Sequence, residues 1–105
     1  MQVTLQEKGK FIEIIIDEDR ISFNNIEKLQ EIIEQEIEKK HYFININLEK
    51  VIYTSSVFFN FILNLYKKMK SLNGQLKLTQ ISEDVNEALK LVAIDKLIEI
   101  ECKEV

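Results

Sequence analysis

The stretch VIYTSSVFFNFILNLY, residues 51–66, carries the chain from a β-rich run into a long apolar segment, with two adjacent serines at the junction. From residue 56 to residue 72 the apolar side chains recur at the spacing of one helical face. They are Phe58, Phe61, Ile62, Leu65, Met69 and Leu72. Serine is a preferred residue at a helix N-terminus, and the pair Asn73-Gly74 supplies the left-handed stop that ends many helices. The stretch therefore predicts a helix over residues 56–72 that begins at a serine.

A second helix is predicted ahead of this one. Asn24 lies three residues before Glu27, which is a weak capping-box pattern, and helical periodicity then continues through Lys40. Its apolar positions are Ile26, Leu29, Ile33 and Ile37. Lys39 and Lys40 come at the negative end of the helix dipole, where cations are favourable.

A third helix is predicted after residue 82. Ser82 is placed to cap it, and Glu83 and Asp84 in its first turn complement the positive end of the helix dipole. Its buried side is predicted to consist of Val85, Ala88, Leu89 and Val92.

Short alternating runs predict the strands between these helices. The first two runs flank Gly9, which predicts a β-hairpin that turns at this residue. The predicted strands are residues 2–6, 11–16, 42–48, 75–80 and 97–102. The resulting order β-β-α-β-α-β-α-β indicates an α/β fold, a mixed sheet covered by three main helices. No proline and no linker interrupts the chain, so we expect a single domain over residues 1–105.

Composition excludes several classes of protein. The chain has 105 residues, 46% of them hydrophobic, and a net charge of −4 with a pI near 5.1. Nucleic-acid-binding proteins usually cluster Lys and Arg against phosphates, so we expect no nucleic-acid partner. No run reaches the roughly 18 apolar residues of a membrane span, and the start MQVTLQEKGK lacks the apolar core of a signal peptide. With Cys102 as the single cysteine, a soluble cytoplasmic protein without disulfides is expected.

Side chains capable of catalysis or metal binding are not grouped in the sequence. His41 is the only histidine and has no cysteine or histidine at metal-ligand spacing, so it is predicted at the surface or at a strand entry. Gly9 and Gly74 are the only glycines, which excludes a glycine-rich phosphate loop. The acidic run 17–19 reads as a solvated turn. We therefore expect no enzyme, no cofactor and no metal.

The region from Asn47 onward resembles the STAS domain, the module of bacterial anti-sigma-factor antagonists. The family pattern is a strand ending in Asp-or-Asn-Leu, an aromatic-any-Asp-Ser-Ser-or-Ala-Gly loop, and a helix that ends in Gly-Gly. The corresponding residues here are Asn47-Leu48, Tyr53 to Phe58, and Asn73-Gly74. The run ISEDVNEALKLVAIDKLIEI, residues 81–100, is similar to the segment that follows in the family, with Ala93 in place of a glycine.

This resemblance implies a regulatory function controlled at Ser56. In the family, the serine at this position is phosphorylated by a partner that is both an anti-sigma factor and a serine kinase of the histidine-kinase-like ATPase type. The unmodified protein binds this partner and releases the sigma factor. A phosphate adds about −1.5 to −2 charges at the start of the helix, and an interface that accepts a neutral hydroxyl does not accept that charge.

Several residues depart from the family pattern and leave alternatives open. Sporulation-type members carry aspartates where this chain has Ser55 and Ser22. Val57 and Phe58 replace smaller residues, so the backbone near the acceptor is more crowded. Ser55 or Ser56 could serve only as a helix cap. The alternative function is a STAS adaptor without phosphorylation that binds a transporter ATPase or a signalling scaffold.

Phe59 and Leu63 are surplus to the apolar stripe of the helix. They fall about 100 and about 140 degrees round the helix axis from Phe58, so we expect them at the edge of the core or in the open. Exposed apolar groups beside an acceptor serine suit a docking patch, although a neighbouring element of the domain could also cover them. The predicted partner-binding residues are Ser22, Ser55, Ser56, Val57, Phe59 and Leu63.

Overall fold

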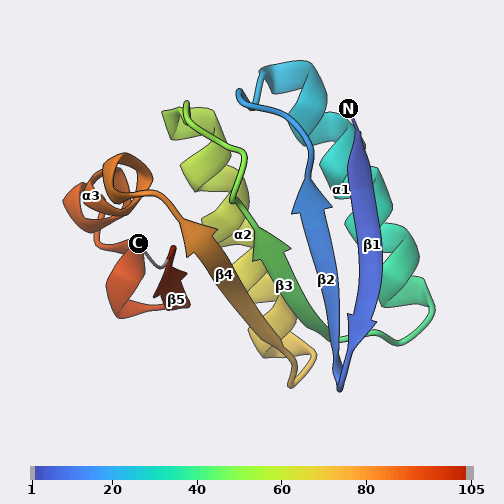
Figure 1. The fold of residues 1–105 in the computed structure, drawn as a ribbon. Coiled ribbons are helices and arrows are strands. Elements are labelled where there is room, and N and C mark those ends of the chain that lie inside the picture. The colour runs from blue at the N-terminus through green and yellow to red at the C-terminus, as the bar shows by residue number, and fades with distance from the viewer. Residues whose placement is uncertain (1, 104–105) are drawn as a thin grey trace.

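A computed structural model describes residues 2–103 and shows a mixed sheet with three helices (Figure 1). The elements in chain order are β1 (Val3–Lys8), β2 (Phe11–Ile16), α1 (Phe23–Glu38), β3 (Phe43–Asn47), α2 (Ser56–Ser71), β4 (Gln75–Ile81), α3 (Glu83–Leu91), the 3-10 turn η1 (Ile94–Lys96) and β5 (Glu99–Cys102). The predicted fold class and the order β-β-α-β-α-β-α-β are confirmed.

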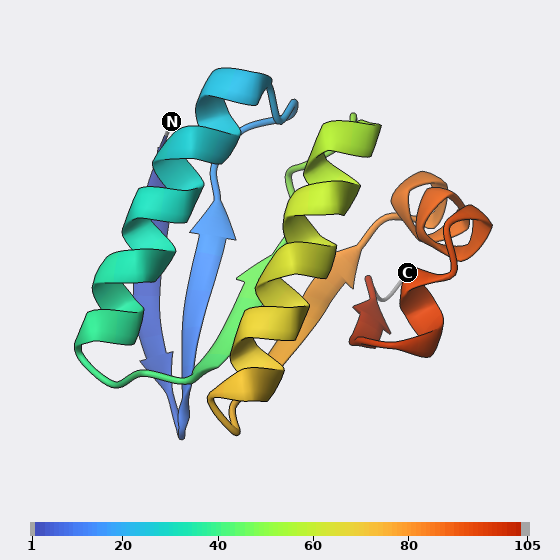
Figure 2. The same cartoon turned by 180° about the vertical axis from the view of Figure 1, so that it is seen from behind.

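The sheet has the spatial order β1-β2-β3-β4-β5. β1 pairs antiparallel with β2 around the turn at Gly9, which has a φ of 60°, and all later pairs are parallel. Each parallel pair needs a crossover, and α1, α2 and α3 supply them in turn. α1 and α2 lie side by side on one face of the sheet (Figure 2), whereas Figure 1 shows the opposite face without a helix over it. We call that opposite face the open face.

The hydrophobic core lies between the sheet and its two covering helices. Parallel register aligns Ile14, Ile46 and Leu78 across three strands, and all three side chains are fully buried. From α2, Phe58, Ile62, Leu65 and Met69 pack onto this row, as the helical periodicity predicts. Phe61 and Leu72, also predicted on the apolar face, are half-buried at its margin.

The start of α1 differs from the sequence prediction. Ser22, not Asn24, is the N-cap, and its Oγ accepts a hydrogen bond from the backbone N–H of Asn25 at 3.3 Å. The helix ends at Glu38, so Lys39 and Lys40 lie just beyond it and Lys40 turns the chain with a φ of 67°. Serine and asparagine are both favourable N-cap residues. Ser22 takes this position because the helical conformation begins at the residue after it, Phe23.

Gly74 is required for a reason other than the one predicted. Asn73, with a φ of 58°, is the left-handed residue after α2, whereas Gly74 has no positive φ. A Cβ built on Gly74 would collide with the carbonyl oxygen of Tyr42. Glycine therefore lets the backbone before β4 approach the backbone before β3.

The C-terminal third also contains two corrections. Ser82 caps α3 as predicted, with its Oγ accepting from the backbone N–H of Val85 at 3.3 Å. Val92, predicted on the buried side, is exposed because α3 ends at Leu91 and Ala93 turns the chain with a φ of 60°. The last strand is shorter than predicted, since the 3-10 turn comes first and leaves Leu97 exposed.

In the part of the chain that the structure describes, no helix is both long and apolar enough to span a bilayer. Within residues 2–103, histidine, cysteine, aspartate and glutamate side chains also form no group of three that could hold a metal ion.

Candidate functional site

Two loops meet at the N-termini of α1 and α2. The backbone N–H groups of Ile52 and Tyr53 donate to the carbonyl of Asp19 at 2.8 and 3.0 Å, and Tyr53 forms an isolated parallel β-bridge with Arg20. Val51 anchors the same loop in the core. These contacts hold the starts of the two helices next to each other (Figures 1 and 2).

Ser22 and Ser55, which are 33 positions apart in the chain, converge at this point. Both are N-caps: Ser55 Oγ accepts from the backbone N–H of Phe58 at 3.4 Å, as Ser22 does from Asn25. They line one pocket of about 310 Å³, together with Arg20, Ile21, Tyr53 and Thr54. The structure thus brings together two of the predicted site residues through their capping positions.

Ser56 is the first residue of α2 and lies in the open. Its hydroxyl forms no hydrogen bond with any residue among 2–103, since the capping role belongs to Ser55. The first turn of α2 contains no acidic side chain. A negative group on Ser56 would therefore meet the positive end of a helix dipole without a neighbouring carboxylate in that turn.

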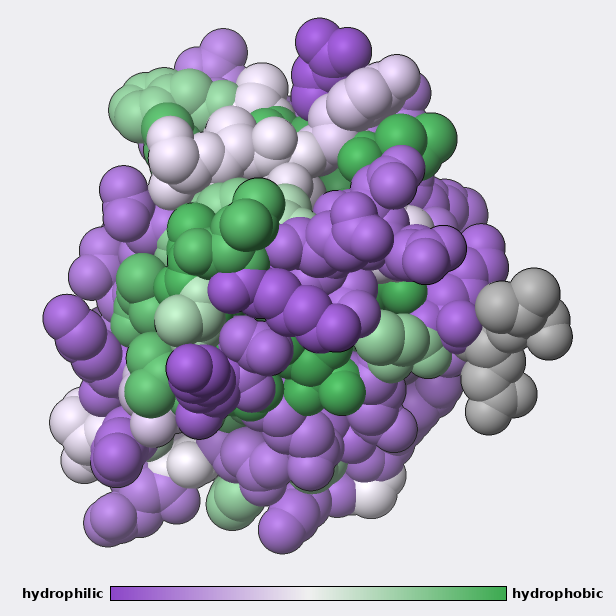
Figure 3. Space-filling view, turned by 90° about the vertical axis from the view of Figure 1, so that its left-hand side faces the viewer, coloured by the Kyte–Doolittle hydropathy of each residue, from purple (hydrophilic) through white to green (hydrophobic). Residues whose placement is uncertain are grey.

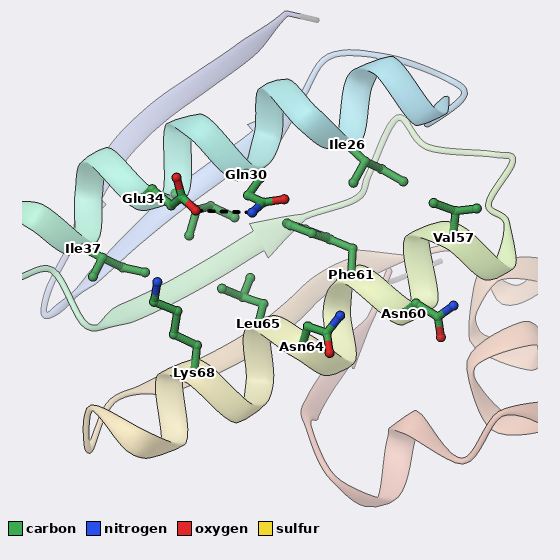
Figure 4. Close-up of a pocket in the computed structure, with 11 residues that line it drawn as sticks. Ile26, Gln30, Glu34, Ile37, Val57, Asn60, Phe61, Asn64, Leu65 and Lys68 are labelled. Carbon is green, nitrogen blue, oxygen red and sulfur yellow. Dashed lines mark hydrogen bonds between the residues drawn. The ribbon is translucent and has the colours of Figure 1, made fainter.

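The crowding expected from Val57 and Phe58 is only partly present. Phe58 is fully buried, so its ring packs in the core and leaves the space outside Ser56 free. Val57 is 42% exposed and lies on the flank of α2 that faces α1. There it lines a groove with Ile26 and Phe61 (Figure 4).

Phe59 and Leu63 lie on the other flank of α2. Both are half-buried and pack against the margin of the core, which is the edge position expected from the helical wheel. Ser56, Phe59 and Leu63 are spaced i, i+3 and i+7, so they follow one side of the helix. Val57 does not belong to that side, and the six predicted contact residues therefore do not form one continuous patch.

The sequence patterns did not indicate three exposed residues at the same end of the molecule, Arg20, Phe23 and Ile52. They lie near Tyr53, an exposed residue of the family loop, and the guanidinium of Arg20 lies 4.8 Å from the Tyr53 ring centroid. One sequence feature could have identified them: each is an apolar or basic residue within three positions of a helix cap, where solvated loops usually carry small polar residues.

A hydrophobic surface also appears near α3. Leu91, Val92 and Leu97 are exposed around the turn that follows this helix. The space-filling view shows green apolar patches interrupted by purple polar side chains on this side of the molecule (Figure 3). These residues were not predicted as contacts, and Val92 was predicted in the core.

Comparison with known proteins identifies the fold. A family model described as the STAS domain matches residues 2–104. A putative anti-sigma factor antagonist of Thermotoga maritima has a TM-score of 0.82 at 20% identity, over 94% of this chain and 85% of that one. An anti-sigma-factor antagonist (STAS) domain protein of Planctomyces limnophilus gives 0.81 at 17% identity, over 97% and 91%.

The Bacillus cell fate determinant SpoIIAA in its phosphorylated form is a more distant neighbour. It has a TM-score of 0.72 at 13% identity, over 94% of this chain and 90% of that one. At these identities the structural likeness concerns the fold. The comparison with curated protein sequences finds no match.

Proposed function

This chain belongs to the STAS domain family, and from that membership we propose that it is an anti-sigma-factor antagonist controlled by phosphorylation at Ser56. Its partner is an anti-sigma factor with serine-kinase activity of the histidine-kinase-like ATPase type. The chain binds this partner and performs no catalysis, and it works in the cytoplasm without metal or cofactor. The observation that carries the proposal is the exposed hydroxyl of Ser56 at the first position of α2, which forms no hydrogen bond within residues 2–103.

The position of Ser56 suits a switch that leaves the fold intact. Ser55 caps the helix, so modification of Ser56 breaks no capping hydrogen bond. The added charge is favourable at the helix N-terminus, and it opposes only a partner surface that is apolar or acidic. The charge therefore acts mainly on the interface and little on the stability of the domain.

Neighbouring residues provide the remaining contacts in this proposal. Phe59 and Leu63 continue from Ser56 along one side of α2 and supply apolar anchors at the margin of the core. Ser22 and Ser55 contribute polar contacts in the pocket between the two helix starts. Val57 contacts the partner from the opposite flank.

A STAS adaptor without phosphorylation is the second candidate. The specific observation in its favour is that the pocket beside Ser55 is lined by Arg20 and two serines, where sporulation-type members were expected to carry aspartates. A kinase that recognises acidic residues beside its target finds none among the residues lining this pocket. Such an adaptor would bind a transporter ATPase or a signalling scaffold through the same helix start.

The test is phosphorylation by a partner recovered from the source cell. The tagged wild-type protein is used to isolate the partner, and the complex is incubated with ATP and analysed by intact mass and peptide mapping. We expect one phosphate on Ser56, none in Ser56→Ala, and undiminished modification in the matched control Ser71→Ala, which removes a serine at the opposite end of α2. A partner that binds and hydrolyses ATP but leaves Ser56 unmodified contradicts the switch and favours the adaptor.

A further inference from the structure

The open face of the sheet contains a buried polar row that the proposed function does not use. Glu13 on β2, Asn45 on β3 and Thr79 on β4 are 5%, 6% and 7% exposed, although no helix covers this face (Figure 1). Glu13 is directly paired with Asn45 in the sheet register. It is also the one charged residue in the otherwise apolar strand FIEIII.

Hydrogen bonds run along this row in one direction. Thr79 Oγ1 donates to Asn45 Oδ1 at 2.8 Å, and Asn45 Nδ2 donates to Glu13 Oε2 at 3.2 Å. The donors are thus directed toward Glu13, whose second oxygen is left as a buried acceptor. Glu13 Oε1 accepts no hydrogen bond within residues 2–103.

Lys8 is a loosely held counterion for this carboxylate. Its Nζ lies 3.0 Å from Glu13 Oε1, which is close enough for an ion pair, although the geometry does not form a hydrogen bond. The Lys8 side chain is 59% exposed and the Glu13 side chain 6%. An exposed ammonium on a flexible stem gains little from such a pair and can be replaced by another cation.

A pocket of about 480 Å³ opens above the row, a volume typical of small-molecule sites. Charged side chains also line this pocket, namely Glu49, Glu101, Lys8 and Lys103. Lys77 is not part of the lining, but its Nζ lies 3.6 Å from Glu101 Oε2. Gln80 also lines it, with a φ of 56° at a β-bulge where the β4–β5 register shifts. Bulges and left-handed non-glycine residues cost free energy and gather at functional sites.

We propose that this pocket binds a small organic amine, whose ammonium donates to Glu13 Oε1 in place of Lys8. Burying a carboxylate costs free energy unless it is paired and hydrogen-bonded. An uncharged residue at position 13 would allow the same strand pairing without this cost, so the carboxylate points to a binding role. The acceptors that line the pocket include Glu13 Oε1, the Thr79 hydroxyl oxygen and the carboxylates of Glu49 and Glu101. The three glutamates outnumber the two lysines of the lining, Lys8 and Lys103, so the pocket favours a cationic ligand with N–H donors. This site is independent of Ser56 and of the proposed partner.

The test is a titration with putrescine followed by NMR of the backbone amides at constant ionic strength. We expect saturable shifts at Glu13, Asn45, Thr79 and Gln80, and no such shifts with sodium chloride. Glu13→Gln should weaken binding at least about tenfold, because the ligand loses its charged acceptor. Lys8→Met should strengthen binding about threefold or more, because it removes the internal competitor.

Three results overturn the proposal. The first is the absence of saturable shifts in both the wild type and Lys8→Met, and the second is an unchanged affinity in Lys8→Met. Because Lys8 is exposed, we expect Lys8→Met to fold, so it tests the proposal even if Glu13→Gln does not fold. The third is binding of a short lysine-containing peptide but not of putrescine, which would assign the pocket to a side chain of a partner protein.

Discussion

Gly74 shows how one backbone contact restricts the choice of residue. Its α-carbon lies so close to Tyr42 that a Cβ would clash with that carbonyl oxygen, and this oxygen also accepts a hydrogen bond from the N–H of Gln75 at 2.9 Å. Gly9 has the opposite character, because its φ is 60° but nothing lies within 4 Å of a Cβ built there. The two glycines therefore separate the effect of close packing from that of backbone conformation.

Gly74→Ala is predicted to destabilise the protein more than Gly9→Ala does. Gly9→Ala costs about 1–2 kcal/mol because it places an L-residue in the left-handed region. Gly74→Ala requires the backbone before β3 or β4 to move, and we expect it to cost about 3 kcal/mol. Urea unfolding of both variants measures the difference. Equal losses would mean that the backbone at Gly74 relaxes without cost.

Ser55 and Ser56 are predicted to differ in what their removal changes. Ser55→Ala removes the cap of α2 and should lower the free energy of unfolding by about 1 kcal/mol, whereas Ser56→Ala should change it by less than about 0.5 kcal/mol. For partner binding, Ser56→Ala should be neutral, and Ser56→Asp should weaken association because it adds charge at the interface. Thermal melts and titration calorimetry give the two quantities. A stability loss in Ser56→Ala instead of Ser55→Ala would reverse the assignment of the cap.

α2 combines a structural face and a candidate contact face in one element. Its sheet-facing residues form the centre of the core, and one flank lines the groove shared with α1 (Figure 4). The other flank holds Phe59 and Leu63, which are half-buried and close to Ser56 along the helix. Val57, at the start of the α1-facing flank, is also a proposed contact, so only residues farther along that flank are expected to leave partner binding unchanged when truncated.

Phe59→Ala is predicted to weaken partner association by about 1–3 kcal/mol, as truncation of an interface anchor usually does. Asn64→Ala is the matched control, because Asn64 is an exposed residue of the same helix on the flank that faces α1. Titration calorimetry measures binding, and a circular dichroism melt of each variant excludes unfolding. If the folded Phe59→Ala protein binds like the wild type, the contact surface does not include this flank.

At the scale of the whole molecule, local patterns predicted the elements better than the contacts between them. Helical periodicity at Phe58, Ile62, Leu65 and Met69 identified α2, because side chains that meet a sheet must recur every three or four residues. The cap at Ser22 was missed, since the choice between Ser22 and Asn24 depends on where tertiary contacts hold the preceding loop.

The candidate site was predictable only in part for the same reason. Ser55 and Ser56 were visible at the start of a periodic segment, and the family resemblance selected Ser56. The meeting of Ser22 with Ser55 in one pocket depends on the bridge between Arg20 and Tyr53, which no sequence spacing encodes. Likewise, the sequence of β2 did not indicate that Glu13 would be buried on the open face of the sheet.

The connection from α1 to β3 predicts how the stability of the whole molecule depends on pH. Glu36 is a buried carboxylate whose Oε1 lies 3.1 Å from His41 Nδ1 and whose Oε2 lies 3.0 Å from Lys39 Nζ. Burial raises the pKa of Glu36, but the hydrogen bonds and charges of His41 and Lys39 outweigh it, so the pKa lies below its ordinary value of 4.5. The folded state therefore binds this proton less readily than the unfolded chain does.

Stability from Glu36 should be fully present above pH 4.5 and should disappear as the pH falls through the lower pKa of the folded state. Glu36→Gln removes the charge and with it this dependence. The difference in unfolding free energy between the wild type and Glu36→Gln should therefore shrink between about pH 6 and about pH 3. Asp17→Asn is the control, because Lys50 and Thr4 lower the pKa of the half-buried Asp17, and salt weakens its pair with the exposed Lys50. Urea titrations at several pH values, at low and high salt, measure both differences. A difference for Glu36→Gln that stays constant from pH 6 to pH 3 would show that the ion pairs of Glu36 do not contribute to folding.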